Sequence, residues 1–295
     1  MNNKYPVYIP TKGRADISLT AVCLIEDKIP FYLVVEPQEY DSYYTRFGHE
    51  PLATILTLPF SNLGRGSIPA RNWIKQHSTD NGDKRHWQLD DNIRKFLRLH
   101  KGKRIPCEAG IGLRVTEDFT DRYTNVAIAG LNYDFFAISR KKPYLLNAHV
   151  YSCTLVLNEI PHEWRLRYNE DTDMCLQVLA DGWCTVQMNS FLINKARTMT
   201  MKGGNTDSLY KDDGRTVMAR SLERMWPNVV TTNRRFGRAQ HIVKAAWAKF
   251  DNKLIRRTDI DFEELAKKEY KIGLHQVAPE IKSKQIQDFK DDYDK

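Results

Sequence analysis

The sequence predicts an α/β fold in which helices flank a mostly parallel sheet, and three observations support this class. Strand-like apolar segments alternate with helical patterns through the amino-terminal third of the chain. Several of these segments end in polar residues, as strands do at the ligand-binding edge of such a sheet. The 295 residues are 41% hydrophobic and 28% charged, which is the composition of a globular protein with a substantial core.

The amino-terminal third contains the most regular pattern. Four strands are predicted there, at residues 5–9, 31–37, 53–59 and 86–91. A helical pattern follows the polar loop 11–14, and a second helix begins near Pro69, because proline is favoured in the first turn of a helix. This alternation of strand and helix predicts parallel pairing.

The rest of the chain is less regular. Further elements are expected as strands at residues 126–138 and 151–160, lining a cleft, and as a helix at 171–180. Gly182 is expected to close that helix. Beyond about residue 235 the pattern becomes basic and amphipathic, which predicts helices. We therefore expect an α/β domain over residues 1–235 and a basic helical extension over residues 236–295, which packs on or beside it.

Charge and composition restrict the class of partner. Basic residues outnumber acidic ones by 45 to 37, and the formal net charge of +8 favours an anionic partner such as a nucleotide or nucleic acid. No apolar run approaches the length of a membrane span, and the amino terminus lacks a secretory pattern, so we expect a cytoplasmic protein with no membrane partner. The five cysteines lack the spacing of a zinc site or a disulfide framework.

Polar residues after three of the predicted strands are expected to meet at one edge of the sheet. They are Pro10, Thr11 and Arg14 after the first strand, Glu36 at the end of the second, and Asp90, Asp91 and Asn92 after the fourth. The acidic cluster has two interpretations. It is either a polar turn, which is common after a strand, or a site where hard carboxylate oxygens hold a divalent cation against substrate phosphates.

Three acids stand at the start of the helix predicted at 171–180, namely Glu170, Asp171 and Asp173. One interpretation is an acidic first turn that complements the helix dipole. Helical periodicity places Asp171 on the face of Met174 and Val178, and it places Asp173 on the opposite, solvent face. Because partial burial raises the pKa of a carboxyl group, Asp171 is the better candidate for a general base.

Three motifs together resemble a known enzyme family. The stretch "GSIPARNWIKQHSTDNGDKRHWQLDDN", the block "NEDTDMCLQVLADGW" and the opening strand "VYIPTKGR" resemble motifs of family 2 nucleotide-sugar glycosyltransferases of the GT-A fold. Within that group, "WQLDDNIRKF", the same Glu-Asp block and the basic stretch "RRFGRAQHIVKAAWAKF" look most like the phage glycosyltransferases associated with TET-type oxygenases.

The resemblance implies a role for each matching residue. It implies an inverting transfer from a nucleoside diphosphate sugar, with a UDP-sugar expected, in which Asp171 is the base and Glu170 its neighbour in the Glu-Asp motif. The metal, Mn²⁺ or Mg²⁺, would lie at Asp90, Asp91 and Asn92, although the amide at Asn92 departs from the acidic family pattern. The nucleotide sugar would contact Pro10, Thr11, Arg14, Glu36, Arg71, Asn72, Asp90 and Lys202.

Some of these residues also have purely structural interpretations. Arg71 and Asn72 would serve equally as a helix salt bridge and a cap. Lys202 lies in the "KGGN" loop, which is either a lid that carries a cation to the diphosphate or a plain surface turn.

The acceptor implied by the resemblance is a hydroxymethylated pyrimidine in duplex DNA. Four basic residues of the carboxy-terminal stretch are expected to contact phosphates, namely Arg234, Arg235, Arg238 and Lys244. The same stretch would also suit an amphipathic helix that caps the core. Two alternatives stay open: a glycosyltransferase that acts on carbohydrate or protein, and a non-catalytic nucleic-acid-binding module. The sequence predicts no oligomeric state.

Overall fold

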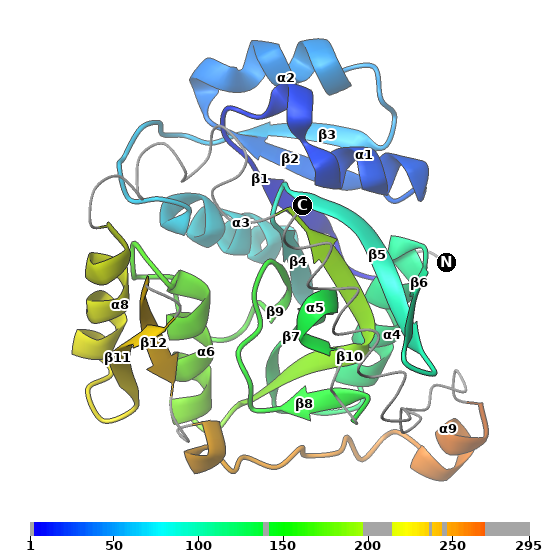
Figure 1. Cartoon of the computed structure of the whole chain (residues 1–295). Coiled ribbons are helices and arrows are strands. Elements are labelled where there is room, and N and C mark those ends of the chain that lie inside the picture. Colours follow the sequence, from blue (N-terminus) through cyan, green and yellow to red (C-terminus); the bar gives the residue numbers. More distant parts are fainter. Residues whose placement is uncertain (1–2, 138–141, 197–213, 236–237, 244–246, 269–295) are drawn as a thin grey trace.

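The computed structural model describes residues 3–137, 142–196, 214–235, 238–243 and 247–268, which form an α/β protein (Figure 1). Its ten-stranded mixed sheet has the order β3-β2-β1-β4-β9-β7-β10-β5-β6, with β8 paired to β10. The strands are β1 (Val7–Pro10), β2 (Phe31–Val35), β3 (Ala53–Thr57), β4 (Arg85–Leu89), β5 (Ile93–His100), β6 (Lys103–Pro106), β7 (Val126–Tyr133), β8 (Tyr144–Leu146), β9 (Cys153–Leu157) and β10 (Cys184–Lys195).

Helices cover both faces of this sheet. The α-helices are α1 (Leu19–Glu26), α2 (Tyr40–Phe47), α3 (Ile68–Asp80), α4 (Ala109–Thr120), α5 (Asp134–Ala137), α6 (Glu170–Ala180), α8 (Gly214–Met225) and α9 (Phe262–Lys268). Short 3-10 helices lie at η1 (Ala15–Ile17), η2 (Pro37–Glu39) and η3 (Trp247–Lys249). The predicted α/β class is therefore confirmed, and none of the described helices is long and apolar enough to span a membrane.

The four amino-terminal strands pair in parallel, in the order β3-β2-β1-β4. Strand side chains alternate between faces, so Val7 and Ile9 pack in a core with α1 and α4. Tyr8 points the other way, into a core with Ile74 of α3. Because parallel strands end at the same edge, the residues that follow β1, β2 and β4 lie together.

The strand β9 runs antiparallel to both β4 and β7. Its first residues therefore reach the edge where β4 ends, and Cys153 pairs with Leu89. Gly130 of β7 permits the close approach of β9 at this point, because a Cβ there would lie 2.1 Å from the carbonyl oxygen of Cys153. The residues just before β9 thus join the functional edge of the sheet.

The helix α6 ends at Ala180 and is closed, as predicted, by Gly182, which has a φ of 84°. The backbone N–H of Gly182 donates to Leu179 O, and the N–H of Trp183 donates to Val178 O. This pair of bonds is a Schellman motif, in which a left-handed residue satisfies the last carbonyls of the helix.

Four strands of the main sheet were not predicted, namely β5, β6, β8 and β10. The longest of them, β10, follows α6. Both β5 and β10 lie between other strands of the sheet, and periodicity alone does not separate such strands from buried helices.

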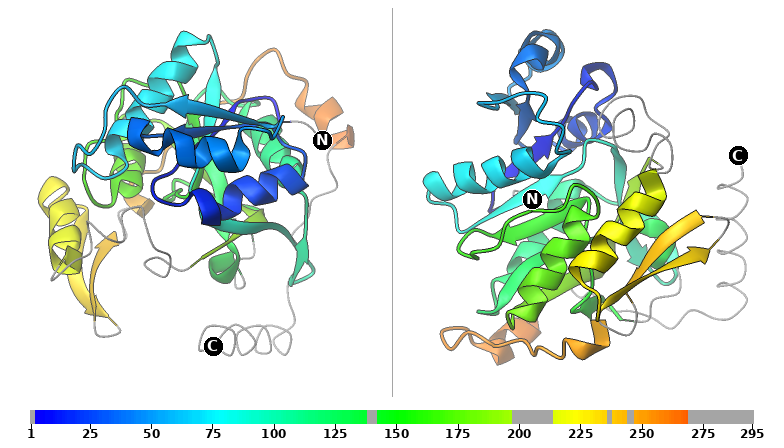
Figure 2. Two further views of the ribbon diagram at one scale, coloured as in Figure 1. Left: turned by 90° about the horizontal axis from the view of Figure 1, so that it is seen from above. Right: turned by 90° about the vertical axis from the view of Figure 1, so that its left-hand side faces the viewer.

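The carboxy-terminal region differs from the predicted helical extension. A hairpin of β11 (Val230–Arg235) and β12 (Arg238–Val243) crosses the predicted domain boundary at residue 235. Figure 2 shows this hairpin with α8 as a layer beside α6, and Leu176, Leu222 and Val230 form the apolar contact between them. Three consecutive β-branched residues at 230–232 favour a strand here. Helix does occur later, in α9.

Candidate active site

A cavity of about 1200 Å³ opens at the carboxyl-terminal edge of the sheet. It is lined by the ends of β1, β2, β4, β7 and β10, by the residues before β9, and by the start of α6. The residues predicted to meet at one edge do so, because Pro10, Thr11, Arg14, Glu36, Asp90, Asp91 and Asn92 all line this cavity. So do Arg71, Glu170 and Asp171, which come from two helices.

Asp90 is the most heavily bonded carboxylate in the cavity. It accepts from Lys195 Nζ at 2.5 Å, from Ser152 Oγ at 2.7 Å and from Arg71 Nη2 at 3.1 Å. Burial alone would raise the pKa of Asp90, but the cations of Lys195 and Arg71 outweigh it and hold that pKa below its usual range. Asp90 is therefore a fixed negative charge.

Lys195 was not predicted, although it stands at the end of β10, where ligand-binding residues gather. Its ammonium group also donates to Ser152 Oγ at 2.8 Å and to Tyr133 Oη at 3.4 Å. Burial opposes its charge, but Asp90 raises the pKa of Lys195 above its ordinary value. The signal that could have found it is the stretch "CTVQMNSFLINK", a strand that ends in a cation.

Arg71 connects the two acidic parts of the site. Its guanidinium donates to Asp90, to Gln88 Oε1 at 3.1 Å and to Asp171 Oδ2 at 3.5 Å, and its side chain is only 4% exposed. Gln88 is itself held by His86, whose Nε2 lies 2.9 Å from Gln88 Nε2. Burial lowers the pKa of His86 to about 4, so the neutral ring can accept from Gln88. A buried polar chain thus fixes Arg71.

Asp171 lies at the cavity wall, at the start of α6. Trp164 Nε1 donates to its Oδ1 at 3.4 Å, in addition to the contact from Arg71. Burial raises the pKa of Asp171 to about 7 against the opposing charge of Arg71. The neighbouring Glu170 accepts from Ser67 Oγ at 2.7 Å and also raises the pKa of Asp171. A carboxylate that is protonated and deprotonated near neutral pH is suited to general base catalysis.

The side chain of Asp91 belongs to a hydrogen-bond network separate from that of Asp90. It accepts from Arg14 Nη1 at 2.5 Å and from Thr11 Oγ1 at 2.8 Å, and Tyr43 Oη lies 2.7 Å from the same hydroxyl of Thr11. Burial raises the pKa of Asp91 although Arg14 opposes this shift. Thr11 and Arg14, predicted to contact the nucleotide sugar, therefore have their side chains bonded to this carboxylate.

The predicted metal ligands do not fit a divalent cation as they are arranged. Such a cation takes about six or more oxygen ligands, but Asp90 is already paired with two cations and Asp91 with Arg14. Of the three predicted ligands, Asn92 alone has a buried side-chain oxygen without a hydrogen-bond partner among the described residues. Anywhere in the part of the chain that the structure describes, no three His, Cys, Asp or Glu residues form a group that could hold a metal.

Glu36 lines the cavity directly after β2. It accepts from Lys12 Nζ at 2.6 Å and from Gln38 Nε2 at 2.6 Å. Burial alone would raise the pKa of Glu36, but these two bonds lower it below its ordinary value. Lys12 was not predicted and lines the cavity as well. Glu36 and Lys12 thus present a paired carboxylate and ammonium group to the cavity, beside the ends of β1 and β2.

The structure places two neighbouring residues differently from what the sequence predicted. Asp173, expected on a solvent face, is fully buried and accepts from Arg165 Nε at 2.9 Å and from Trp226 Nε1 at 2.7 Å. The layer that contains α8 covers this face of α6, which the periodicity of one helix cannot reveal. Asn72, expected at the nucleotide, is not among the residues that line the cavity. Its amide exchanges hydrogen bonds with the backbone of Trp164 at 2.8 and 2.9 Å.

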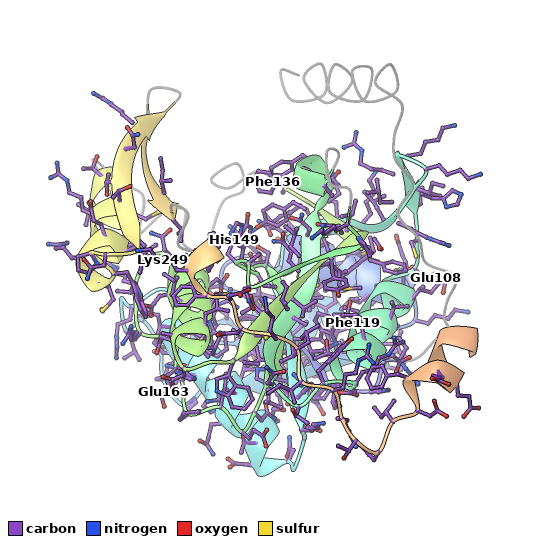
Figure 3. The ribbon with its side chains drawn as sticks, turned by 90° about the horizontal axis from the view of Figure 1, so that it is seen from below. Glu108, Phe119, Phe136, His149, Glu163 and Lys249 are labelled. Atoms are coloured by element: carbon purple, nitrogen blue, oxygen red, sulfur yellow. The ribbon has the colours of Figure 1, made fainter. Side chains whose placement is uncertain are left out.

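A run of aromatic side chains, Phe136, Tyr133, Tyr151, His149 and Trp247, forms another wall of the cavity. Successive ring centroids lie 5.8, 4.8, 4.8 and 5.7 Å apart. Phe136 is 45% exposed. Figure 3 shows Phe136 and His149 along this run, with Lys249 marking the short helix that carries Trp247. The aromatic run was not predicted, since its members come from three distant segments.

The basic residues expected to bind nucleic acid are only partly described. Arg234 is exposed on β11, and Arg235 pairs with Arg238 in the backbone register of the hairpin. Val243 at the end of β12 and Trp247 line the cavity, so the hairpin leads to its rim. The predictions for Lys202 and Lys244 lie outside the described residues.

Comparisons with known proteins give one family. A family model described as "TET-Associated Glycosyltransferase" matches residues 5–204, more than half of the chain. No curated protein matches the chain. Among solved structures, the crystal structure of mannose-6-phosphate isomerase from Helicobacter pylori aligns with 86% of this chain and 94% of its own chain. The identity is 8% and the TM-score 0.31, which is too low to support a conclusion. The mixed α/β sheet is consistent with a GT-A-like glycosyltransferase.

Proposed function

The chain belongs to the TET-associated glycosyltransferase family, and from this we propose that it transfers a sugar from a nucleoside diphosphate sugar, with a UDP-sugar expected, to a hydroxymethylated pyrimidine in duplex DNA. The enzyme class follows from the family, and the donor class follows from the enzyme class. The non-catalytic module considered from the sequence is not supported, because the family is one of glycosyltransferases.

The observation that carries the proposal is the position of Asp171. It faces the cavity, its pKa is raised to about 7, and Arg71 separates it from Asp90. Deprotonated Asp171 would take the proton of the acceptor hydroxyl as that oxygen attacks the anomeric carbon. Attack from the face opposite the leaving diphosphate inverts the anomeric centre. Glu170 supports the high pKa of Asp171 through its own charge.

The nucleoside end of the donor is assigned to the cavity lining after β1 and β2. Pro10, Glu36 and Lys12 lie there, and the Glu36 carboxylate can accept a hydrogen bond from a ribose hydroxyl. The aromatic run lies on the other side of the strand ends. This arrangement supports a donor that lies across the edge of the sheet, with its sugar near Asp171.

Two features support a nucleobase acceptor. The aromatic run offers π faces against which a planar base can stack, which is worth about 1–3 kcal/mol per base. The open end of the hairpin reaches the same rim at Val243, and Arg234, Arg235 and Arg238 stand at the other end, near its turn, where they could contact phosphates of a duplex that extends beyond the cavity. An enzyme that modifies a base in a duplex must move that base out of the stack, and the cavity of about 1200 Å³ has room for it.

The proposal includes no metal step, because the carboxylates that would bind Mn²⁺ or Mg²⁺ are already paired with cations. A cytoplasmic location stays a prediction from the sequence.

A donor and acceptor panel tests the proposal. The protein would be incubated with UDP-, GDP- and ADP-sugars and with duplex DNA that contains hydroxymethylcytosine or hydroxymethyluracil. The DNA is then digested and its nucleosides are weighed by mass spectrometry. We expect one hydroxymethylated nucleoside to gain the mass of one sugar residue, while unmodified DNA gains none. Transfer to carbohydrate or protein hydroxyls, with none to DNA, would instead establish the alternative acceptor class.

A further inference from the structure

We propose that Lys195, held by Asp90 and Ser152 at the end of β10, carries the positive charge that stabilises the departing diphosphate, and that transfer needs no divalent cation. This inference rests on the cavity being the donor site of the proposed function. It does not depend on DNA being the acceptor.

The acidic cluster is already paired within the protein. A carboxylate that binds a metal must direct free oxygen lone pairs toward it. Both oxygens of Asp90 are occupied, Oδ1 by Arg71 at 3.1 Å and Oδ2 by Lys195 at 2.5 Å and Ser152 at 2.7 Å. A cation placed there would meet a carboxylate whose charge is already neutralised by two side chains that are only 4% and 13% exposed. The local charges are therefore balanced without a metal.

The ammonium group of Lys195 is placed to meet a phosphate. Lys195 lines the cavity, and its strand ends at the edge where β1 and β4 also end. Of its three hydrogen bonds to described residues, the one to Tyr133 Oη is the longest at 3.4 Å, whereas those to Asp90 and Ser152 are short. A phosphate oxygen can replace this long contact while the other two keep the ammonium in place. Arg71 adds a second cation, which is buried and fixed by Gln88.

The chemical step balances with the groups present. The bond between the anomeric carbon and the phosphate oxygen breaks, and its electron pair stays on the diphosphate, which gains a negative charge next to Lys195. The acceptor oxygen forms the new bond to the anomeric carbon, and its proton moves to Asp171. Fixed cations that face a developing charge in a water-poor site stabilise the transition state strongly.

The first experiment measures the need for metal. Protein treated with EDTA is assayed for transfer with the productive donor, before and after addition of Mn²⁺ or Mg²⁺. We expect transfer to continue in EDTA and to change little with either ion. Transfer that disappears in EDTA and returns with Mn²⁺ would overturn the proposal.

The second experiment measures diphosphate binding without any acceptor. Wild-type protein, Lys195→Met and Lys195→Arg are titrated calorimetrically in EDTA with UDP, uridine and inorganic pyrophosphate. Lys195→Met should weaken UDP and pyrophosphate binding by about tenfold or more, because a hydrogen bond to a charged group is removed. Uridine binding should be unchanged, and Lys195→Arg should recover most of the affinity. The matched control is Lys253→Met, at an exposed lysine paired with Asp251.

A third variant separates charge from folding, since Lys195→Met leaves Asp90 with one cation fewer. In Lys195→Met/Asp90→Asn both charges are removed, and thermal melting checks that the protein is folded. We expect this folded double variant to bind pyrophosphate as weakly as Lys195→Met does. If it binds pyrophosphate as tightly as the wild type, Lys195 serves only to neutralise Asp90, and the proposal is wrong. A failure of DNA glycosylation alone would leave these binding results intact and would count only against the acceptor.

Discussion

Arg71 Nη2 lies 3.5 Å from Asp171 Oδ2, although the two residues are 100 positions apart in the sequence. The same nitrogen donates to Asp90, so one buried guanidinium joins the acids of two different motifs. Its charge opposes the rise in the pKa of Asp171, yet burial keeps that pKa near 7. The three side chains therefore form one network of charges in the wall of the cavity.

Replacing Asp171 with Asn should remove the base while keeping the size of the side chain. A general base contributes roughly 10²- to 10⁴-fold, so kcat should fall by about that factor while donor affinity barely changes. Transfer kinetics and calorimetry measure the two effects. Asp251→Asn, at a residue whose side chain is 80% exposed, is the matched control. Full transfer by Asp171→Asn would exclude it as the base.

Transfer should depend on the ionisation of Asp171, because only the deprotonated carboxylate accepts a proton. Since burial raises the pKa of Asp171 to about 7, the rate should rise with pH up to and through neutrality and then level off. Below that pKa, each pH unit should lower kcat by about tenfold. A pH profile of single-turnover rates measures this. A rate that stays constant across this range would show that Asp171 is not the group that limits the reaction.

Asp173 should stabilise the fold instead of serving catalysis. Replacing it with Ala leaves the Nε1 of Trp226 and the guanidinium of Arg165 without their carboxylate. Removal of such a buried partner costs about 3 kcal/mol of unfolding free energy. Urea denaturation measures this change, with Asp181→Ala as the control because that side chain is 61% exposed. Equal stability of the two variants would contradict the anchoring role.

Phe136 should contribute to acceptor binding, because it is the exposed end of the aromatic run. Phe136→Ala should raise the KM for modified DNA by about tenfold, which corresponds to the removal of one stacked ring. The KM for the donor should stay unchanged. Tyr44→Ala is the matched control, since Tyr44 is an aromatic residue of similar exposure, 48% against 45%, that does not line the cavity. A rise in the donor KM alone would place the donor against this wall.

The hairpin arginines should provide the salt-dependent part of DNA binding. Charge reversal at Arg234, Arg235 and Arg238 should weaken binding to every duplex tested and lower the salt slope by about one unit for each phosphate that is no longer neutralised. Fluorescence anisotropy over a range of salt concentrations measures both effects. The control reverses three exposed basic residues that do not line the cavity, namely Lys28, Arg46 and Lys84. Equal weakening in both triple variants would indicate a general charge effect.

The amino-terminal half of the site could be predicted from the sequence. Each of the strands β1, β2 and β4 is short, largely buried and followed by polar residues, and parallel strands bring such ends to one edge. Pro10, Glu36 and Asp90 therefore meet in the structure as expected. Local reasoning also placed Asp171 on the apolar face of its own helix, and the residue lines the cavity, while its role as the base stays a prediction.

Residues whose environment is made by distant segments could not be predicted. Lys195 is recognisable only once β10 is known to lie in the sheet, and Asp173 is buried only because α8 covers it. Asn72 shares a helix with Arg71, but the rotation of that helix turns one toward the cavity and the other toward Trp164.

The sequence by itself thus determined the α/β class, the shared edge at which the parallel strands end and the candidate base, because these depend on local periodicity and on the geometry that all parallel sheets share. The tertiary structure alone decided how the charges are paired. An ion pair depends on the distance between atoms, and the partners of Asp90 come from positions 71, 152 and 195 of the chain. For that reason the cluster predicted as a metal site is, in the folded protein, a carboxylate already held by a lysine and an arginine.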